Sequence, residues 1–141
     1  MPNYHHNDGF TLIELLIVIG IIGILASVVI VAINPSSQLT NARDAKRLVY
    51  AKELRNAAFN YIVDAGGYPG DKSIPTGSGN KLHICQEGVT DGSCINWDDL
   101  AGEFIKEIPV DDLQTGSTIS GYSTYLGPGA RIVVVSNFLG Q

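Results

Sequence analysis

The chain is short of basic side chains, and none occurs before Arg43. Its 141 residues include nine Lys and Arg against fourteen Asp and Glu, which gives a formal net charge of −5 at pH 7. Much of the acidic excess lies in the second half, at Asp91, Asp98, Asp99, Glu103, Asp111 and Asp112. Proteins that bind nucleic acid draw much of their affinity from clustered Lys and Arg that neutralise phosphates. The composition therefore argues against a nucleic-acid partner.

The sequence patterns of common catalytic sites are also lacking. There is no H-E-x-x-H pattern and no G-x-S-x-G pattern. Residues 77–81 (GSGNK) lack the spacing, the Ser or Thr and the preceding strand of a phosphate-binding loop. We therefore expect no enzymatic activity. The enzymatic alternative is a small hydrolase, anchored in a membrane, that uses scattered Asp and Ser side chains.

Cysteine is scarce, since Cys85 and Cys94 are the only two. Together with His83 they are too few for a structural zinc site, which takes four ligands. In an exported domain, two neighbouring cysteines favour a disulfide that closes the small loop around Gly88 and Gly92. We predict this disulfide, with free thiols as the alternative.

A long stretch without charge is the most informative feature of the chain. No charged side chain occurs between Glu14 and Arg43, and residues 12–33 are apolar nearly throughout. About 20 apolar residues in a helix, with about 30 Å of rise, are enough to cross a bilayer. A buried core helix is the weaker alternative, because so small a domain could hardly cover a helix that is apolar on every side. We predict a transmembrane helix over residues 10–35.

The residues before this stretch are short and polar. Residues 1–9 (MPNYHHNDG) end in Gly9, and we interpret them as a leader peptide. A cleaved secretory signal is the competing interpretation, but it would have a basic start and an apolar region of about 7–15 residues. Here the apolar run is longer, and the start contains His5 and His6 but no Lys or Arg.

A second helix is predicted beyond Asn34 and Pro35, where proline favours a kink or break. Ser36 or Ser37 would cap it, and Gly66 and Gly67 would end it. Its apolar positions fall on one side at helical spacing: Leu48, Ala51, Leu54, Ala58, Tyr61, Ile62 and Ala65. We expect this amphipathic half of the long helix to pack on a sheet.

The rest of the chain predicts a small head. Residues 68–80 are rich in Gly, Pro and Ser and are typical of a loop, and residues 97–108 predict a short helix between Asn96 and Pro109. Residues 118–126 and 131–138 predict a β-hairpin. The expected fold is therefore α+β: a long N-terminal helix, its first half transmembrane and its second half amphipathic, packed on a small antiparallel β-sheet. Residues 36–141, including the second half of the helix, would form an exported globular head domain.

Glu14 is out of place in an apolar span. A carboxylate at mid-bilayer costs about 2.5–3.5 kcal/mol on insertion scales, less near the end of a span, and such residues usually have a partner. A cut between Gly9 and Phe10 would create an α-amino group one helical turn before Glu14. It is too far for a bond within one helix, but a neighbouring copy displaced along the axis could pair its carboxylate with that amine. The alternative is that Glu14 snorkels to the lipid headgroups.

The stretch from Gly9 to Ala26, GFTLIELLIVIGIIGILA, resembles the signature of type IV prepilins and type II secretion pseudopilins. A weaker likeness covers residues 34–47, 97–100 and 108–111. The resemblance implies that a membrane-embedded prepilin peptidase cuts after Gly9 and methylates Phe10, and that Glu14 serves subunit docking and assembly. It also implies a pilin-like fold.

The resemblance further implies a location and partners. The precursor would be a single-pass protein of the cytoplasmic (inner) membrane and would then join an extracellular or periplasmic filament. That filament would be a homo-oligomer with minor pilins, built by an inner-membrane assembly platform with a cytoplasmic ATPase. The choice between a pilus and a secretion pseudopilus stays open. The alternative function is a membrane-anchored binding domain that does not polymerise.

No cofactor is expected, with one exception. Asp111 and Asp112, with carbonyl groups of the following loop, offer oxygen ligands of the kind that Ca²⁺ takes. Some pseudopilins bind calcium, so the resemblance implies that these two residues could form a calcium site. The alternative is that both are solvated loop carboxylates.

Overall fold

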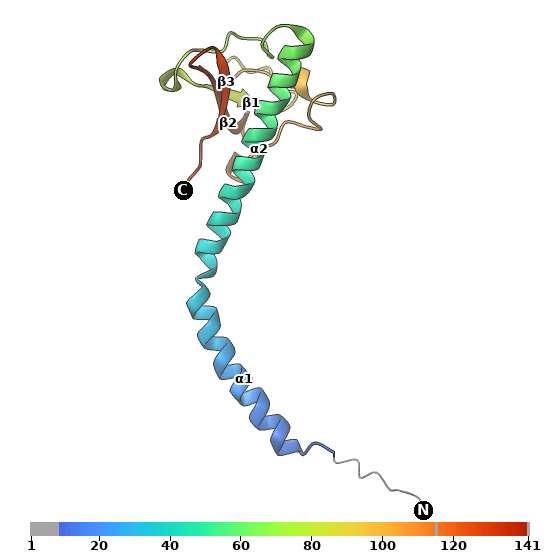
Figure 1. Cartoon of the computed structure of the whole chain (residues 1–141), viewed down its shortest axis with the longest axis vertical. Coiled ribbons are helices and arrows are strands. Elements are labelled where there is room, and N and C mark those ends of the chain that lie inside the picture. The colour runs from blue at the N-terminus through green and yellow to red at the C-terminus, as the bar shows by residue number, and fades with distance from the viewer. Residues whose placement is uncertain (1–8, 115, 141) are drawn as a thin grey trace, which may run out of the picture. The chain divides into compact units, whose positions relative to one another are not determined.

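A computed structural model describes residues 9–114 and 116–140 of the chain (Figure 1). The proposed leader therefore lies outside the described residues, apart from Gly9. The chain divides into two compact units, and the boundary falls between Leu39 and Thr40. The predicted α+β class is confirmed: a long apolar helix is followed by a small antiparallel sheet.

The first helix, α1, spans Leu12–Ile33 and is apolar all round. Its 22 residues have the length and the composition to cross a membrane. None of its side chains is buried, so the structure gives no support to the alternative of a core helix.

The predicted break between the two helices is confirmed at Asn34, which has left-handed backbone angles (φ 46°, ψ 76°). Asn is among the few non-glycine residues that adopt this conformation readily. The second helix, α2, spans Pro35–Ala65. The predicted cap at Ser36 or Ser37 is wrong, because the helix already begins at Pro35. Proline suits the first helical position, where its missing N–H has no helical partner to bond.

One face of α2 contributes to the core of the head. Ala51, Leu54 and Ala58 are buried at helical spacing, as the apolar stripe predicted, and Ala57, which the stripe did not include, is buried beside them. Tyr61 and Ile62 are half-buried, whereas Leu48 and Ala65, at the two ends of the predicted stripe, are exposed. The helix ends as predicted at Gly66, which has a φ of 72° and donates its N–H to the carbonyl of Ile62 (3.0 Å).

The sheet has three antiparallel strands in the order β1-β2-β3. Their bounds are Leu82–Cys85 for β1, Ile119–Gly127 for β2 and Arg131–Ser136 for β3. The hairpin of β2 and β3 confirms the prediction, with Tyr122 opposite Ser136 and Gly127 opposite Arg131. Strand β1 was not predicted, because four residues are too few to show an alternating pattern.

The predicted helix over residues 97–108 is wrong. Only the 3₁₀ turn η2, Asp98–Leu100, forms there. Two similar turns lie elsewhere in the head: η1, Ser78–Asn80, and η3, Asp112–Gln114. The predicted cap at Asn96 is wrong as well, because the cap position of η2 is Trp97 and no side chain caps the turn. Asn96 instead precedes the turn, and its side-chain oxygen accepts the N–H of Asp98 (2.7 Å). The turn then stops because Trp97 and Leu100 are drawn into the core and Gly102 adopts a φ of 83°.

The predicted disulfide is present. Cys85 of β1 and Cys94 are joined at an S–S distance of 2.06 Å, and both residues are buried. Lys72 braces the closed loop by donating from Nζ to the carbonyls of Gly92 (2.8 Å) and Cys94. The loop is thereby tied to the segment that follows α2.

Candidate assembly site

Glu14 lies in the first turn of α1 and bonds with the residue that caps the helix. Thr11 donates to Oε2 of Glu14 from its backbone N–H (2.9 Å) and from its hydroxyl (2.6 Å). In return, the N–H of Glu14 donates to Oγ1 of Thr11 (3.3 Å). This reciprocal arrangement is a capping box, which satisfies donors that the start of a helix leaves without partners.

The capping box was missed in the sequence, although its pattern is visible there. Thr11 followed three residues later by Glu14, ahead of an apolar run, is the usual signature. It gives Glu14 a structural role within its own chain. Both bonds from Thr11 end on Oε2, so among the described residues no donor is bonded to Oε1. The carboxylate therefore keeps an acceptor for a donor from outside the chain.

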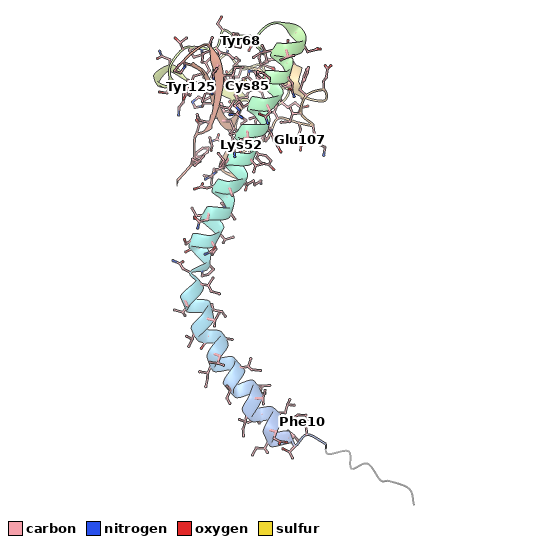
Figure 2. All side chains as sticks on the ribbon, viewed as in Figure 1. Phe10, Lys52, Tyr68, Cys85, Glu107 and Tyr125 are labelled. Atoms are coloured by element: carbon pink, nitrogen blue, oxygen red, sulfur yellow. A yellow bond between two sulfur atoms is a disulfide. The ribbon has the colours of Figure 1, made fainter. Side chains whose placement is uncertain are left out.

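The two processing candidates precede this box. Gly9 lies outside α1, and Phe10 is 91% exposed. Figure 2 shows Phe10 at the amino-terminal end of α1. An extended, uncovered segment is what a peptidase needs to bind a backbone. A new amine at Phe10 would come next to the capping residue Thr11.

Removing the hydroxyl of Thr11 should loosen the first turn of α1. We expect Thr11→Val to cost about 1 kcal/mol of local stability, the usual loss for an N-cap side chain. Hydrogen exchange of the Glu14 amide in a membrane mimetic should then be roughly fivefold faster than in the wild type. Thr11→Ser keeps a hydroxyl and should exchange like the wild type. Equal exchange in all three proteins would show that the capping hydroxyl contributes nothing.

A second cluster of charged side chains surrounds Arg47 of α2. Arg47 is buried and donates to both carboxylate oxygens of Asp111, at 2.7 Å from Nε and 3.2 Å from an Nη. Its other Nη donates to Asp44 (2.9 Å) and to the carbonyl of Phe138 (2.7 Å). Asp44 in turn accepts the N–H of Gly140 (3.1 Å). This cluster, which we call the Arg47 cluster, ties α2 to the Asp111 loop and to the end of the chain.

The Arg47 cluster shifts two pKa values. Burial alone would raise the pKa of Asp111, but the hydrogen bonds from Arg47 and from the Leu113 N–H outweigh it and hold the pKa below its usual value. Hydrogen bonding to Asp111 raises the pKa of Arg47 despite its burial. Both shifts favour the charged form of the group, so the pair holds opposite charges together.

The structure also places the two candidate calcium ligands. Asp111 is 4% exposed and paired with Arg47, so it is not the solvated carboxylate that the alternative predicted. Asp112 is exposed, and Nζ of Lys46 lies 3.2 Å from Oδ1 of Asp112. Residues 9–114 and 116–140 contain no group of three or more His, Cys, Asp or Glu side chains placed to hold a metal ion. A calcium ion at Asp111 would have to compete with the buried guanidinium of Arg47 for the same carboxylate oxygens.

Residues 4–30 match the family described as the prokaryotic N-terminal methylation motif. The type IV major pilin protein PilE of Neisseria gonorrhoeae is 31% identical over 104 residues, which cover 74% of this chain and 51% of the relative. The type IV major pilin protein PilE1 of the same organism is 28% identical over 104 residues, covering 74% of this chain and 48% of the relative. The chain thus spans about half the length of these curated relatives. No solved structure matches it.

Proposed function

Because the chain carries the N-terminal methylation motif of type IV pilins and is homologous to type IV major pilins, we propose that it is a structural subunit of a filament. The filament is a type IV pilus or a type II secretion pseudopilus. The subunit is made as a prepilin whose leader, residues 1–9, is cut off behind Gly9. Residues 10–35 then serve as membrane span and assembly helix, and residues 36–141 form the exported head.

The observation that carries this proposal is the carboxylate of Glu14 in an otherwise apolar, uncovered helix. Nothing within the described chain covers α1, and Oε1 of Glu14 has no bonded donor there. The amine released at Phe10 is the donor that maturation supplies. In a filament, the amine of one copy meets the carboxylate of the next, and the capping bond from Thr11 keeps that carboxylate oriented meanwhile.

Transfer of α1 from the membrane into a filament also requires partner proteins. Lipid tails are as apolar as leucine, so transfer of α1 from bilayer to filament gains little hydrophobic free energy. Packing between helices and the pairing of Glu14 must then hold the subunits together. Extraction from the membrane needs work from outside, which we assign to an inner-membrane assembly platform with a cytoplasmic ATPase. A prepilin peptidase and minor pilins complete the proposed set of partners.

Processing can be tested at Gly9. We expect Gly9→Leu to block cleavage, because a bulky side chain next to the cut bond would exclude the backbone from the peptidase. Mass spectrometry of the amino terminus should find methylated Phe10 in the wild type and an uncut terminus in the variant. Gly20→Leu is the matched control, since a side chain at Gly20 also meets nothing within 4 Å, and it should be cut normally. An uncut Met1 on surface-exposed wild-type protein would defeat the proposed maturation.

The second candidate function is a membrane-anchored binding domain that does not polymerise. The capping box favours it, because capping alone explains a Glu at this position. The two functions differ in what they need from the side chain: a cap needs an acceptor oxygen, whereas assembly needs a negative charge. Purification of surface filaments, followed by sequencing of their main component, decides between them directly.

A further inference from the structure

A groove runs along the head between α2 and the edge strand β3. Its volume is about 730 Å³. Apolar side chains from both elements line it, among them Phe59, Ile62, Ile132 and Val134. Phe59 is 63% exposed within this lining, and contiguous exposed apolar surface often marks an interaction site. The head thus presents an apolar groove that its own side chains leave open.

The groove also has positively charged side chains and borders the outer edge of β3. Arg55 and Arg131 line it, and neither takes part in the ion pairs of the described residues, which involve Lys46 and Arg47. Strand β3 is the last of the sheet, so within the described part of the chain no further strand bonds to its outer edge. Such a surface suits a partner that brings apolar contact together with acidic side chains.

This chain itself carries exposed acidic side chains beside half-buried apolar ones on the other side of α2. Residues 98–107, which we call the acidic segment, expose Asp99, Glu103 and Glu107 and include one Lys. The acidic segment is fixed to α2 by Phe104, whose ring meets Tyr61 edge-on at 5.7 Å. Phe59 of the groove and Tyr61 are two residues apart, and so project about 200° apart around the helix. Figure 1 shows the orange acidic segment and the red β3 on opposite sides of α2.

We infer that the groove between α2 and β3 binds the acidic segment of a second copy of this chain, with Arg55 and Arg131 facing Glu103 and Glu107. The inference rests on the proposed filament. Two different surfaces on opposite sides of one head make a heterologous contact, which repeats from copy to copy as an open chain instead of closing as a dimer. The charges select the partner and its register, while the apolar groove supplies contact area.

Charge reversal tests this pairing. Arg55→Glu with Arg131→Glu places like charges opposite each other, and so does Glu103→Arg with Glu107→Arg. Like charges at an interface cost enough to lower filament yield by about tenfold or more. The four substitutions together restore opposite charges and should recover most of the yield. Arg43→Glu with Lys81→Glu makes the same charge change at exposed positions outside the groove, and should leave the yield unchanged.

Cross-linking gives an independent readout in filaments that are otherwise wild-type. Arg131→Cys with Glu103→Cys in one chain should give a ladder of covalent multimers after treatment with a short thiol cross-linker. Either substitution alone should give no ladder.

The outcomes separate this inference from the proposed function. Filaments that depend on Glu14, yet ignore both reversals and give no ladder, would overturn the groove contact and leave the subunit function intact. The same holds if the fourfold variant yields no more than either double variant. A wild-type chain that forms no filaments would overturn both.

Discussion

Glu14→Gln is expected to abolish filaments while leaving the protein in the membrane with α1 capped. The Gln side chain keeps an oxygen for the bonds from Thr11, and Gln serves at this position of a capping box as Glu does. It lacks the negative charge that would pair with the Phe10 amine of a neighbour. Loss of one partner from a charge pair out of water costs about 3–5 kcal/mol, which is a hundredfold or more in each subunit addition. Glu14→Ala should lose both cap and charge, and should also fail to assemble.

The measurement compares membrane and sheared surface fractions by immunoblotting. Both Glu14 variants should reach wild-type amounts in the membrane and less than about a hundredth in the surface fraction. Thr11→Val is the reverse control, because it weakens the cap and keeps the charge, so it should still form filaments. If Glu14→Gln assembled like the wild type, the cap would be the whole role of the residue. The anchored binding domain would then be the better account.

Asp111→Asn is expected to destabilise the head strongly. The change removes the buried carboxylate that faces Arg47 and leaves Asp44 as the remaining carboxylate bonded to it. Loss of one partner from a buried charge pair costs about 3–5 kcal/mol, and the bond to Asp44 places this change at the lower end, about 3 kcal/mol. The exposed neighbour Asp112 pairs with Lys46 at the surface, where a pair contributes about 0–1 kcal/mol. Asp112→Asn is therefore the matched control. Denaturant unfolding of the full chain in detergent, followed by the fluorescence of the buried Trp97, measures both.

The same pair predicts how stability depends on pH. Because Asp111 has a lower pKa in the folded protein than in the unfolded chain, its contribution is fully present above the unfolded value of about 3.9. It is lost as the pH falls below that value and through the folded pKa. The wild type should thus lose stability over this acid range, while Asp111→Asn should lose less. Equal acid sensitivity in the two proteins would mean that the Arg47 cluster does not stabilise the fold.

Features that depend on neighbouring residues were predictable from the sequence. The extent of α1 follows from an uncharged run, its end from Asn34 and Pro35, and the hairpin from two apolar runs around a Gly-Pro-Gly turn. The disulfide follows from two cysteines in a domain expected to be exported. The capping box belongs to the same local class, and its Thr11 to Glu14 spacing was sufficient to find it.

Features that depend on distant residues were not predictable. The segment after Trp97 has helical spacing, but burial of Trp97 and Leu100 takes the chain into the core and ends the helix after one turn. Asp111 reads as a loop carboxylate, and its partner Arg47 is 64 residues away in the sequence. The groove depends in the same way on α2 and β3 coming together. Tertiary packing determines each of these three features, and no local sequence pattern predicts it.

The pairing of Glu14 with the amine of a neighbouring copy is the central claim, and a high-resolution structure of isolated filaments tests it most directly. We expect the amino nitrogen of Phe10 in one subunit within about 4 Å of the Glu14 carboxylate in an adjacent one, the usual limit for an ion pair. A carboxylate bonded solely to Thr11 of its own chain, with no cationic group of a neighbour in reach, would contradict the account.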